Sequence, residues 1–295
     1  MSELNKRLIA LSVSDAPDRA RLGFPQREID RAVLTICTAL VRAGAEIGYG
    51  GNLDPNGYTF KIFRHLAGAY AGMRETPFHH FIPEPVARNT TYEHLHEALN
   101  EGRGVVQTKI ARGDAFFNAR LGGGGIRLDG RVVQNDAQLT AWFAEVPYAL
   151  TTHAYSTARR KMAECCDARV IIGGKMGILA DPLDIYDGAM PGIVEEAILA
   201  LEAGKPLIVL GAFGGATRDI AIALGLLDQA CKVPRTQQHV SYASAIKRIA
   251  SLARCIPNEF HEELSNIADD DRSEQTAFQA TSLIKKWLGN ISVKQ

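Results

Sequence analysis

The sequence lacks an excess of charge of either sign. Its 33 Lys and Arg residues balance 33 Asp and Glu residues, so the formal net charge is zero. This balance excludes the strongly basic composition expected of a general nucleic-acid binder. No apolar run approaches the ~18–20 residues of a membrane-spanning helix, and the segment Met1–Arg7 lacks the apolar stretch of a secretory signal. These absences predict a cytoplasmic protein with neither a membrane nor nucleic acid as its general partner.

Metal-binding and disulfide patterns are also missing. The five cysteines are an odd number and form no Cys-x-x-Cys pair, which argues against a zinc site and a disulfide framework. Cys165 and Cys166 fall in a helical pattern and are predicted to be small buried side chains. The closest histidine pairs, His79–His80 and His94/His96, have no convincing third ligand. We therefore predict no metal and no cofactor.

What the sequence does contain is an alternation of buried strands and amphipathic helices. With 295 residues, 46% hydrophobic and 22% charged, the composition is that of an ordinary globular protein. Strands are predicted at 7–14, 45–49, 79–83, 168–174 and 205–210, and helices at 26–43, 58–70, 91–100, 156–166, 191–203 and 217–224. This order predicts an α/β fold with a Rossmann-like, doubly wound and mostly parallel sheet.

Two regions depart from this alternation. After residue 230 no strand signal follows, and helices are predicted at 242–252, 258–266 and 274–288. We thus divide the chain into a ligand-binding domain, 1–230, and a C-terminal helical extension, 231–295. The extension either packs on the core or joins copies, and we expect a homo-oligomer. Between 102 and 149 the pattern is weak, with a flexible connection at the four glycines 122–125 and a helix at 136–146.

Glycine and small polar residues follow several of the predicted strands. Ligands of open parallel sheets bind beyond the carboxyl ends of the strands, where helix N-termini expose free amides. Each glycine turn alone has a purely structural explanation, but four of them favour a shared ligand crevice. Neither a Walker A loop nor a Gly-x-Gly-x-x-Gly fingerprint is present. The candidate ligand contacts here are Ser12, Ser14, Gly50, Gly51, Gly174, Lys175 and Gly211, with Phe213 or Tyr49 stacking on a base.

Charged residues near two helix starts complete the candidate site. Pro191-Gly192 begins a helix and presents amides to an anion, and Glu196, one turn later, can reach ribose hydroxyls. The simpler alternative is that carboxylates in a first turn favour the helix dipole. Arg159, in a run of three cations, can offer a forked donor to phosphate, or can belong to a solvated, salt-bridged face.

These segments together resemble the SLOG superfamily, the Rossmann-like group that includes LOG-type phosphoribohydrolases and SLOG ligand sensors. Leu11–Ser14 with Tyr49-Gly50-Gly51 resembles the strand ends of the family's N-terminal half. Arg159–Ala168 is similar to its basic helix ending in Asp-Ala. Gly173-Gly174-Lys175 with Met190–Glu196 resembles its Pro-Gly-Gly…Gly-Thr-x-x-Glu region. The resemblance spans roughly residues 7–225.

The sequence differs from the LOG enzymes in the residues that bind phosphate in those enzymes. An insertion separates Gly174 from Gly192, Ile193 stands where the enzymes have Thr, and Arg159 matches the enzymes' arginine only with a one-residue offset. The resemblance therefore implies binding of a nucleotide-derived signal, such as ADP-ribose or cyclic ADP-ribose, in bacterial signalling or antiphage defence. One alternative is a LOG-like N-glycosidic hydrolase, with Glu196 and Arg159 as its catalytic residues. The other is a structural, oligomer-forming protein.

Overall fold

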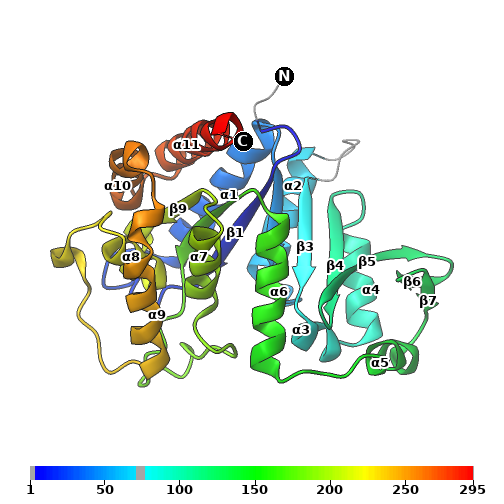
Figure 1. Ribbon diagram of the computed structural model, residues 1–295. Helices are drawn as coiled ribbons and strands as arrows, with labels where there is room; N and C mark the ends of the chain where they lie inside the picture. The colour runs from blue at the N-terminus through cyan, green and yellow to red at the C-terminus, as the bar shows by residue number, and fades with distance from the viewer. Residues whose placement is uncertain (1–3, 71–76, 295) are drawn as a thin grey trace. The chain divides into compact units, whose positions relative to one another are not determined.

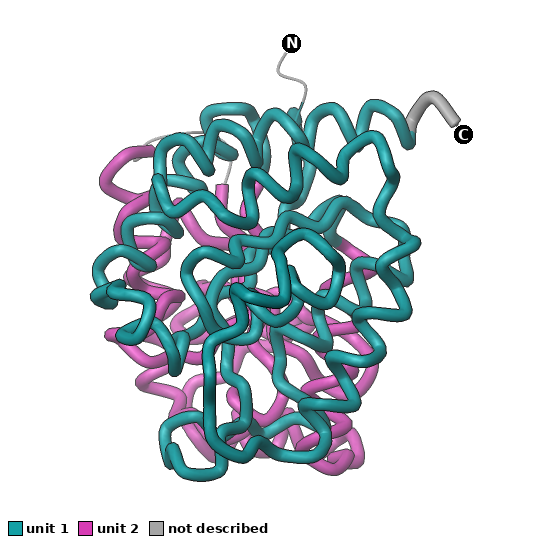
Figure 2. Tube along the Cα trace, turned by 90° about the vertical axis from the view of Figure 1, so that its left-hand side faces the viewer, with its two compact units in different colours: residues 1–45, 166–295 teal, residues 46–165 magenta. Residues whose placement is uncertain are grey.

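The computed structural model describes residues 4–70 and 77–294. The chain forms two compact units, one made of residues 1–45 and 166–295 and the other of residues 46–165 (Figure 2). Residues 1–45 and 166–295 are the first unit, and residues 46–165 are the second unit.

The first unit is built on a parallel sheet of three strands, β1 (Leu8–Ser14), β8 (Ala168–Gly173) and β9 (Leu207–Leu210), in the order β1-β8-β9. Every residue of β8 and β9 is buried. Because both faces of these strands are covered, their residues are apolar without alternation, apart from Arg169 in β8. The helices that follow the strands are α1 (Gln26–Arg42), α7 (Gly192–Glu202) and α8 (Gly215–Ala223).

Helices complete the first unit after β9, as the sequence predicts. They are α9 (Val240–Ser251), α10 (His261–Asp269) and α11 (Ser273–Lys294), with four 3₁₀ turns, η1 (Gly211–Phe213), η2 (Gln229–Cys231), η3 (Ala253–Cys255) and η4 (Asn258–Phe260). Helix α11 packs along α1, where red and blue ribbons lie side by side in Figure 1. These helices belong to the same compact unit as β1, and that unit continues through the domain boundary predicted at residue 230.

The second unit contains a mixed sheet in the order β7-β6-β5-β4-β3-β2. Strands β2 (Glu46–Gly50), β3 (Phe78–Ile82) and β4 (Val106–Arg112) are parallel, whereas β5 (Ala115–Gly122), β6 (Gly125–Leu128) and β7 (Arg131–Val133) pair antiparallel. Its helices are α2 (Tyr58–Tyr70), α3 (Glu84–Arg88), α4 (Tyr92–Glu101), α5 (Asp136–Ala144) and α6 (Thr151–Cys165). The parallel strands and their crossover helices confirm the predicted Rossmann-like α/β class.

The four glycines at 122–125 form a tight β-hairpin between β5 and β6, so the prediction of a flexible connection is wrong. Gly123 and Gly124 have φ of +68° and +79°, the left-handed values of a two-residue hairpin turn. Asp129 and Gly130, with φ of +51° and +77°, close the next hairpin. The structure therefore turns the weakly patterned middle of the chain into an antiparallel extension of the sheet.

One prediction about the cysteines is also wrong. Cys166 is buried as expected, but Cys165 is exposed. Cys37, in α1, is fully buried, and burial raises the pKa of its thiol to about 12. Cys37 is therefore a packed apolar side chain in α1 and no nucleophile.

The buried His80 of β3 makes the second unit sensitive to acid. Its Nε2 lies 3.2 Å from the carbonyl oxygen of Gly51, so this nitrogen carries the donated proton. Burial lowers the pKa of His80 to about 4, although the bond to Gly51 opposes the shift. Because the unfolded chain binds a proton below its ordinary pKa near 6.5 and the folded chain does not, the free energy of unfolding falls by about 3 kcal/mol from pH 6.5 to 4.

Urea unfolding measured across this pH range tests the prediction. His80→Gln keeps a donor for Gly51 and removes the titrating group, so we expect a flatter dependence of unfolding free energy on pH. His153→Gln, at an exposed position of α6, is the matched control and should leave the slope unchanged. Equal slopes for the His80 variant and the unmodified protein would contradict the assignment.

Candidate functional site

The glycine turn after β8 packs tightly against the end of β1. Gly173 and Gly174 have φ of +69° and +109°. A Cβ on Gly173 would lie 2.2 Å from the carbonyl oxygen of Ser14, and one on Gly174 would lie 3.0 Å from Cβ of Ala216 and 3.1 Å from Ile193. Packing alone requires glycine at both positions. Because Gly174 has no side chain, the first turns of α7 and α8 can both pack against it.

The segment after β9 is filled by protein in the same way. A Cβ on Gly211 would lie 2.9 Å from Leu227. The ring of Phe213 is fully buried and packs against Phe24, with 5.5 Å between ring centroids. Phe213 therefore presents no exposed face on which a base could stack.

Ser12 and Glu196 meet at a buried arginine that sequence reasoning missed. Arg169, in β8, is 2% exposed and donates from Nη1 to the Ser12 hydroxyl and to Oε2 of Glu196, the latter at 2.7 Å. The side chain of Glu196 is itself 12% exposed. The two predicted ligand contacts are thus brought together, but each is already bonded to Arg169. In the sequence, Arg169 could have been recognised as the lone charged residue of an otherwise apolar strand.

The first turn of α7 contains backbone donors, two of them on the buried residues Ile193 and Val194. Its N-cap is Pro191, which gives no side-chain cap, and in the described part of the chain the amides of Gly192, Ile193 and Val194 have no protein acceptor. At α8, in contrast, the amide of Gly215 donates to Asp18 at 2.6 Å and the amide of Ala216 donates to Gly174. The first turn of α7 can therefore accept an anion, whereas the first two amides of α8 are already bonded to the protein.

The insertion that precedes α7 encloses a hollow of about 340 Å³. It is lined by Gly177, Ile178, Leu179, Asp181, Pro182, Asp184, Ile185, Tyr186, Gly188, Ala189 and His239. Two aromatic rings, Tyr186 and His239, meet edge to face there, with centroids 6.1 Å apart. The hollow is of the size of a small-molecule site, and it ends only a few residues before the free amides of α7.

Two polar anchors hold this insertion in place. The buried carboxylate of Asp184 accepts hydrogen bonds from the amides of Met176 and Ile178, at 2.9 and 2.7 Å. Its pKa is raised, because burial outweighs the stabilising effect of these bonds. The ammonium of Lys175, a predicted phosphate contact, donates to the carbonyl of Ile185. The side chain of Lys175, the residue after Gly174, thus holds the insertion in place through this hydrogen bond.

A buried ionic cluster supports the same end of the sheet. Arg235 donates to Asp219 at 2.6 Å and lies 3.7 Å from Asp18, and the Tyr242 hydroxyl also donates to Asp219. Burial, reinforced by Asp219, raises the pKa of Tyr242 well above its usual value. The cluster joins the segment after β1, helix α8 and helix α9, which fixes the turn where Asp18 caps α8.

The remaining predicted residues, Gly50, Gly51 and Arg159, lie in the second unit. A Cβ on Gly50 would lie 3.2 Å from the sulfur of Met162, and one on Gly51 would lie 2.4 Å from the Thr59 hydroxyl. Arg159 is one turn before Met162 on α6, and its guanidinium lies over the Tyr155 ring, 5.4 Å from the centroid. Within this unit the glycine turn and the basic helix are thus neighbours.

The described residues contain neither a candidate metal cluster of three or more His, Cys, Asp or Glu side chains nor a helix that is both long and apolar enough to cross a bilayer. The site residues of the first unit are Ser12, Ser14, Gly174, Lys175, Gly192, Glu196, Gly211 and Phe213. Among these, the free amides beginning at Gly192 have the chemistry of an anion site.

The parallel strands and the helices that follow them define a Rossmann-like α/β protein. The family model of SLOG cluster2 matches residues 3–273, and the chain belongs to this family. A search of curated proteins found none that matches the chain. The family match runs past residue 230 and includes α9 and α10.

A double-mutant cycle tests the interaction between Arg169 and Glu196. Arg169→Met leaves a nearly buried carboxylate without its cation, and we expect unfolding free energy to fall by about 3–5 kcal/mol. Glu196→Met should cost a comparable amount, whereas the double variant should cost less than the sum, because neither charge remains unpaired. Urea unfolding measures all four proteins. Additive losses would show that the two side chains do not interact.

Proposed function

We propose that this chain binds a nucleotide-derived small molecule at the N-terminus of α7. The observation that carries the proposal is the uncapped first turn of α7, with free amides at Gly192, Ile193 and Val194. This turn begins three residues after Ala189, which lines the hollow of the preceding insertion. Helix amides and the helix dipole together favour a phosphate. Membership of the SLOG family, a LOG-related nucleotide-ligand fold, supports the same chemistry.

The hollow favours a ligand with a planar group next to its phosphate. Its volume, about 340 Å³, is in the range of small-molecule sites, and the rings of Tyr186 and His239 provide aromatic surface. Leu179 and Ile185, 59% and 63% exposed, add apolar contact at its rim. ADP-ribose or a cyclic relative combines phosphate, ribose and base in this way. We therefore propose a sensing role for such a signal, in bacterial signalling or antiphage defence.

The amide of Gly192 can be removed without removing a side chain. Gly192→Pro deletes one donor at the first helical position, where proline is tolerated, and Pro191 already has the extended backbone that a following proline needs. Gly192→Ala is the matched control that retains the amide. We expect the proline variant to bind ADP-ribose about tenfold more weakly than the alanine variant, since a hydrogen bond to a charged group contributes about 1.5–3 kcal/mol.

Isothermal titration calorimetry with ADP-ribose, cyclic ADP-ribose, NAD and AMP measures this difference. Equal affinity of the two variants for every ligand that binds would place the site elsewhere. Failure of the unmodified protein to bind any of the four would contradict the proposal as a whole.

The alternative function, N-glycosidic hydrolysis, requires Glu196 to act on the ribosyl centre. In this structure its carboxylate is held by Arg169 and lies below the surface. We therefore expect no release of free base when the protein is incubated with nucleoside monophosphates or NAD, as followed by chromatography. Base release that disappears in Glu196→Gln would instead identify a hydrolase.

A further inference from the structure

A basic face covers one side of the antiparallel part of the second unit's sheet. We define it by Gln107 and Lys109 of β4, Phe116, Asn118 and Arg120 of β5, and Arg127 of β6. These residues alternate with others on the same strands, so they share one side of the sheet. The opposite side carries buried residues such as Ala119 and Leu128 and the edge-to-face rings of Phe117 and Trp142.

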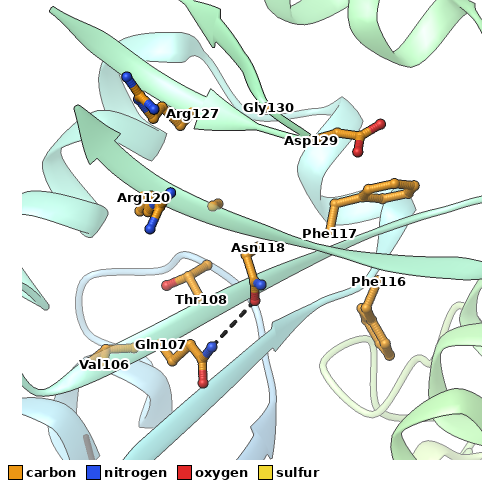
Figure 3. Close-up of a pocket in the computed structure, with 11 residues that line it drawn as sticks. Val106, Gln107, Thr108, Phe116, Phe117, Asn118, Arg120, Arg127, Asp129 and Gly130 are labelled. Atoms are coloured by element: carbon orange, nitrogen blue, oxygen red, sulfur yellow. Dashed lines mark hydrogen bonds between the residues drawn. The ribbon is translucent and has the colours of Figure 1, made fainter. Parts of the chain in front are cut away.

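The basic face contains a hollow of about 640 Å³ (Figure 3). Five residues of the basic face, Gln107, Phe116, Asn118, Arg120 and Arg127, line it. The other lining residues are Val106, Thr108, Phe117, Ala119, Asp129 and Gly130. This volume is in the range that encloses small ligands. The sheet rather than a mobile loop supplies most of the lining, so the groups are held at fixed spacing.

Two arginines stand directly opposite one another in this hollow. Arg120 and Arg127 are cross-strand partners in the register of β5 and β6, and both are exposed. Like charges at such positions destabilise a sheet. In the described part of the chain neither guanidinium has an ion pair or a hydrogen bond. An anion bound between them would offset their repulsion and would meet two forked donors.

The other charged side chains near the hollow do not neutralise Arg120 and Arg127. Lys109, on the same face, has its ammonium 5.2 Å from the centroid of the Phe81 ring. Asp129 is the acidic residue among the described lining residues, and its carboxylate lies 3.7 Å from Arg112, on the opposite side of the sheet. The net charge of the side chains that define the basic face is therefore positive, and charge complementarity calls for an anionic occupant.

Uncharged side chains on the same face can contact the base of a nucleotide. Gln107 donates to Asn118 across the strands at 3.4 Å, a long bond that both amides can exchange for contacts to a ligand. Phe116 is partly exposed and packs edge-on against Phe81, 5.0 Å between centroids, which fixes its ring. Amides and an aromatic ring next to paired arginines are the contacts that a nucleotide requires.

We propose that the basic face is a second binding site, for a small nucleoside polyphosphate, with its phosphates between Arg120 and Arg127. It shares no residue with the site at α7. Two guanidinium forks match a ligand with more than one phosphate group. The site is thus suited to an effector that differs from the ligand at α7.

Titration calorimetry with ATP and with inorganic triphosphate tests the proposal on the full chain. We expect Arg120→Gln/Arg127→Gln to bind both probes at least tenfold more weakly than the unmodified protein. Arg131→Gln is the matched control: it removes one positive charge from the same part of the sheet, but Arg131 pairs with Leu128 in the register and lies on the opposite side. Its affinity should stay within twofold.

The same titrations in a Gly192→Pro background separate the two sites. If the tenfold effect of the arginine substitutions persists there, the basic face binds independently of α7, whether or not the proposed function at α7 holds. Loss of all ATP and triphosphate binding in Gly192→Pro alone would overturn the second site. An equal loss in the control, or no binding of either probe at 0.1 M salt, would also overturn it. If the protein binds single-stranded oligonucleotides more tightly than ATP, with an affinity that grows with their length, the proposal of a small ligand is wrong and the basic face binds a polynucleotide.

Discussion

The first unit depends on one buried guanidinium. Arg169 stands on a strand whose every residue is buried, and it is compensated by the Ser12 hydroxyl on β1 and the Glu196 carboxylate on α7. A charge in such a place is tolerated only when its partners are fixed at hydrogen-bond distance. The pair therefore fixes how α7 is rotated on the sheet. Because the free amides of α7 lie one turn before Glu196, the same bond also determines where those amides point.

The glycine turns show how packing and function share residues in this fold. Gly174 allows Ala216 and Ile193 to approach from two helices, and Asp18 then caps α8 from the segment after β1. Together with the bond from Ala216 to Gly174, the cap satisfies the first two amides of α8. Helix α7 keeps its donors because a proline precedes it and supplies neither a side-chain cap nor an amide. Two helices that begin at the same edge of one sheet thus differ in what they can bind.

The second unit adds a surface of another kind. Its hairpins are closed by left-handed turns at Gly123-Gly124 and Asp129-Gly130, and these turns fix the register that sets Arg120 opposite Arg127. Burial of one side of the hairpins against apolar and aromatic groups such as Trp142 leaves the other side to charged and amide groups. The result is a rigid cationic face that neither the net charge nor the composition of the chain reveals.

The sequence by itself determined the order of β1, β2, β3, β8 and β9 and of the longer helices that alternate with them, because buried parallel strands, helical stripes and terminal glycines are local patterns. It also contained the Asp129-Gly130 hairpin signal, although the short strands around it carry too little periodicity to be recognised with ease. Only the tertiary structure decided the partners of Arg169, which lie 157 and 27 residues away along the chain. It also decided that Phe213 is core, that Cys165 is exposed, and that one helix start is capped while the next is free. Such features arise from contacts between distant segments, and no local periodicity encodes them.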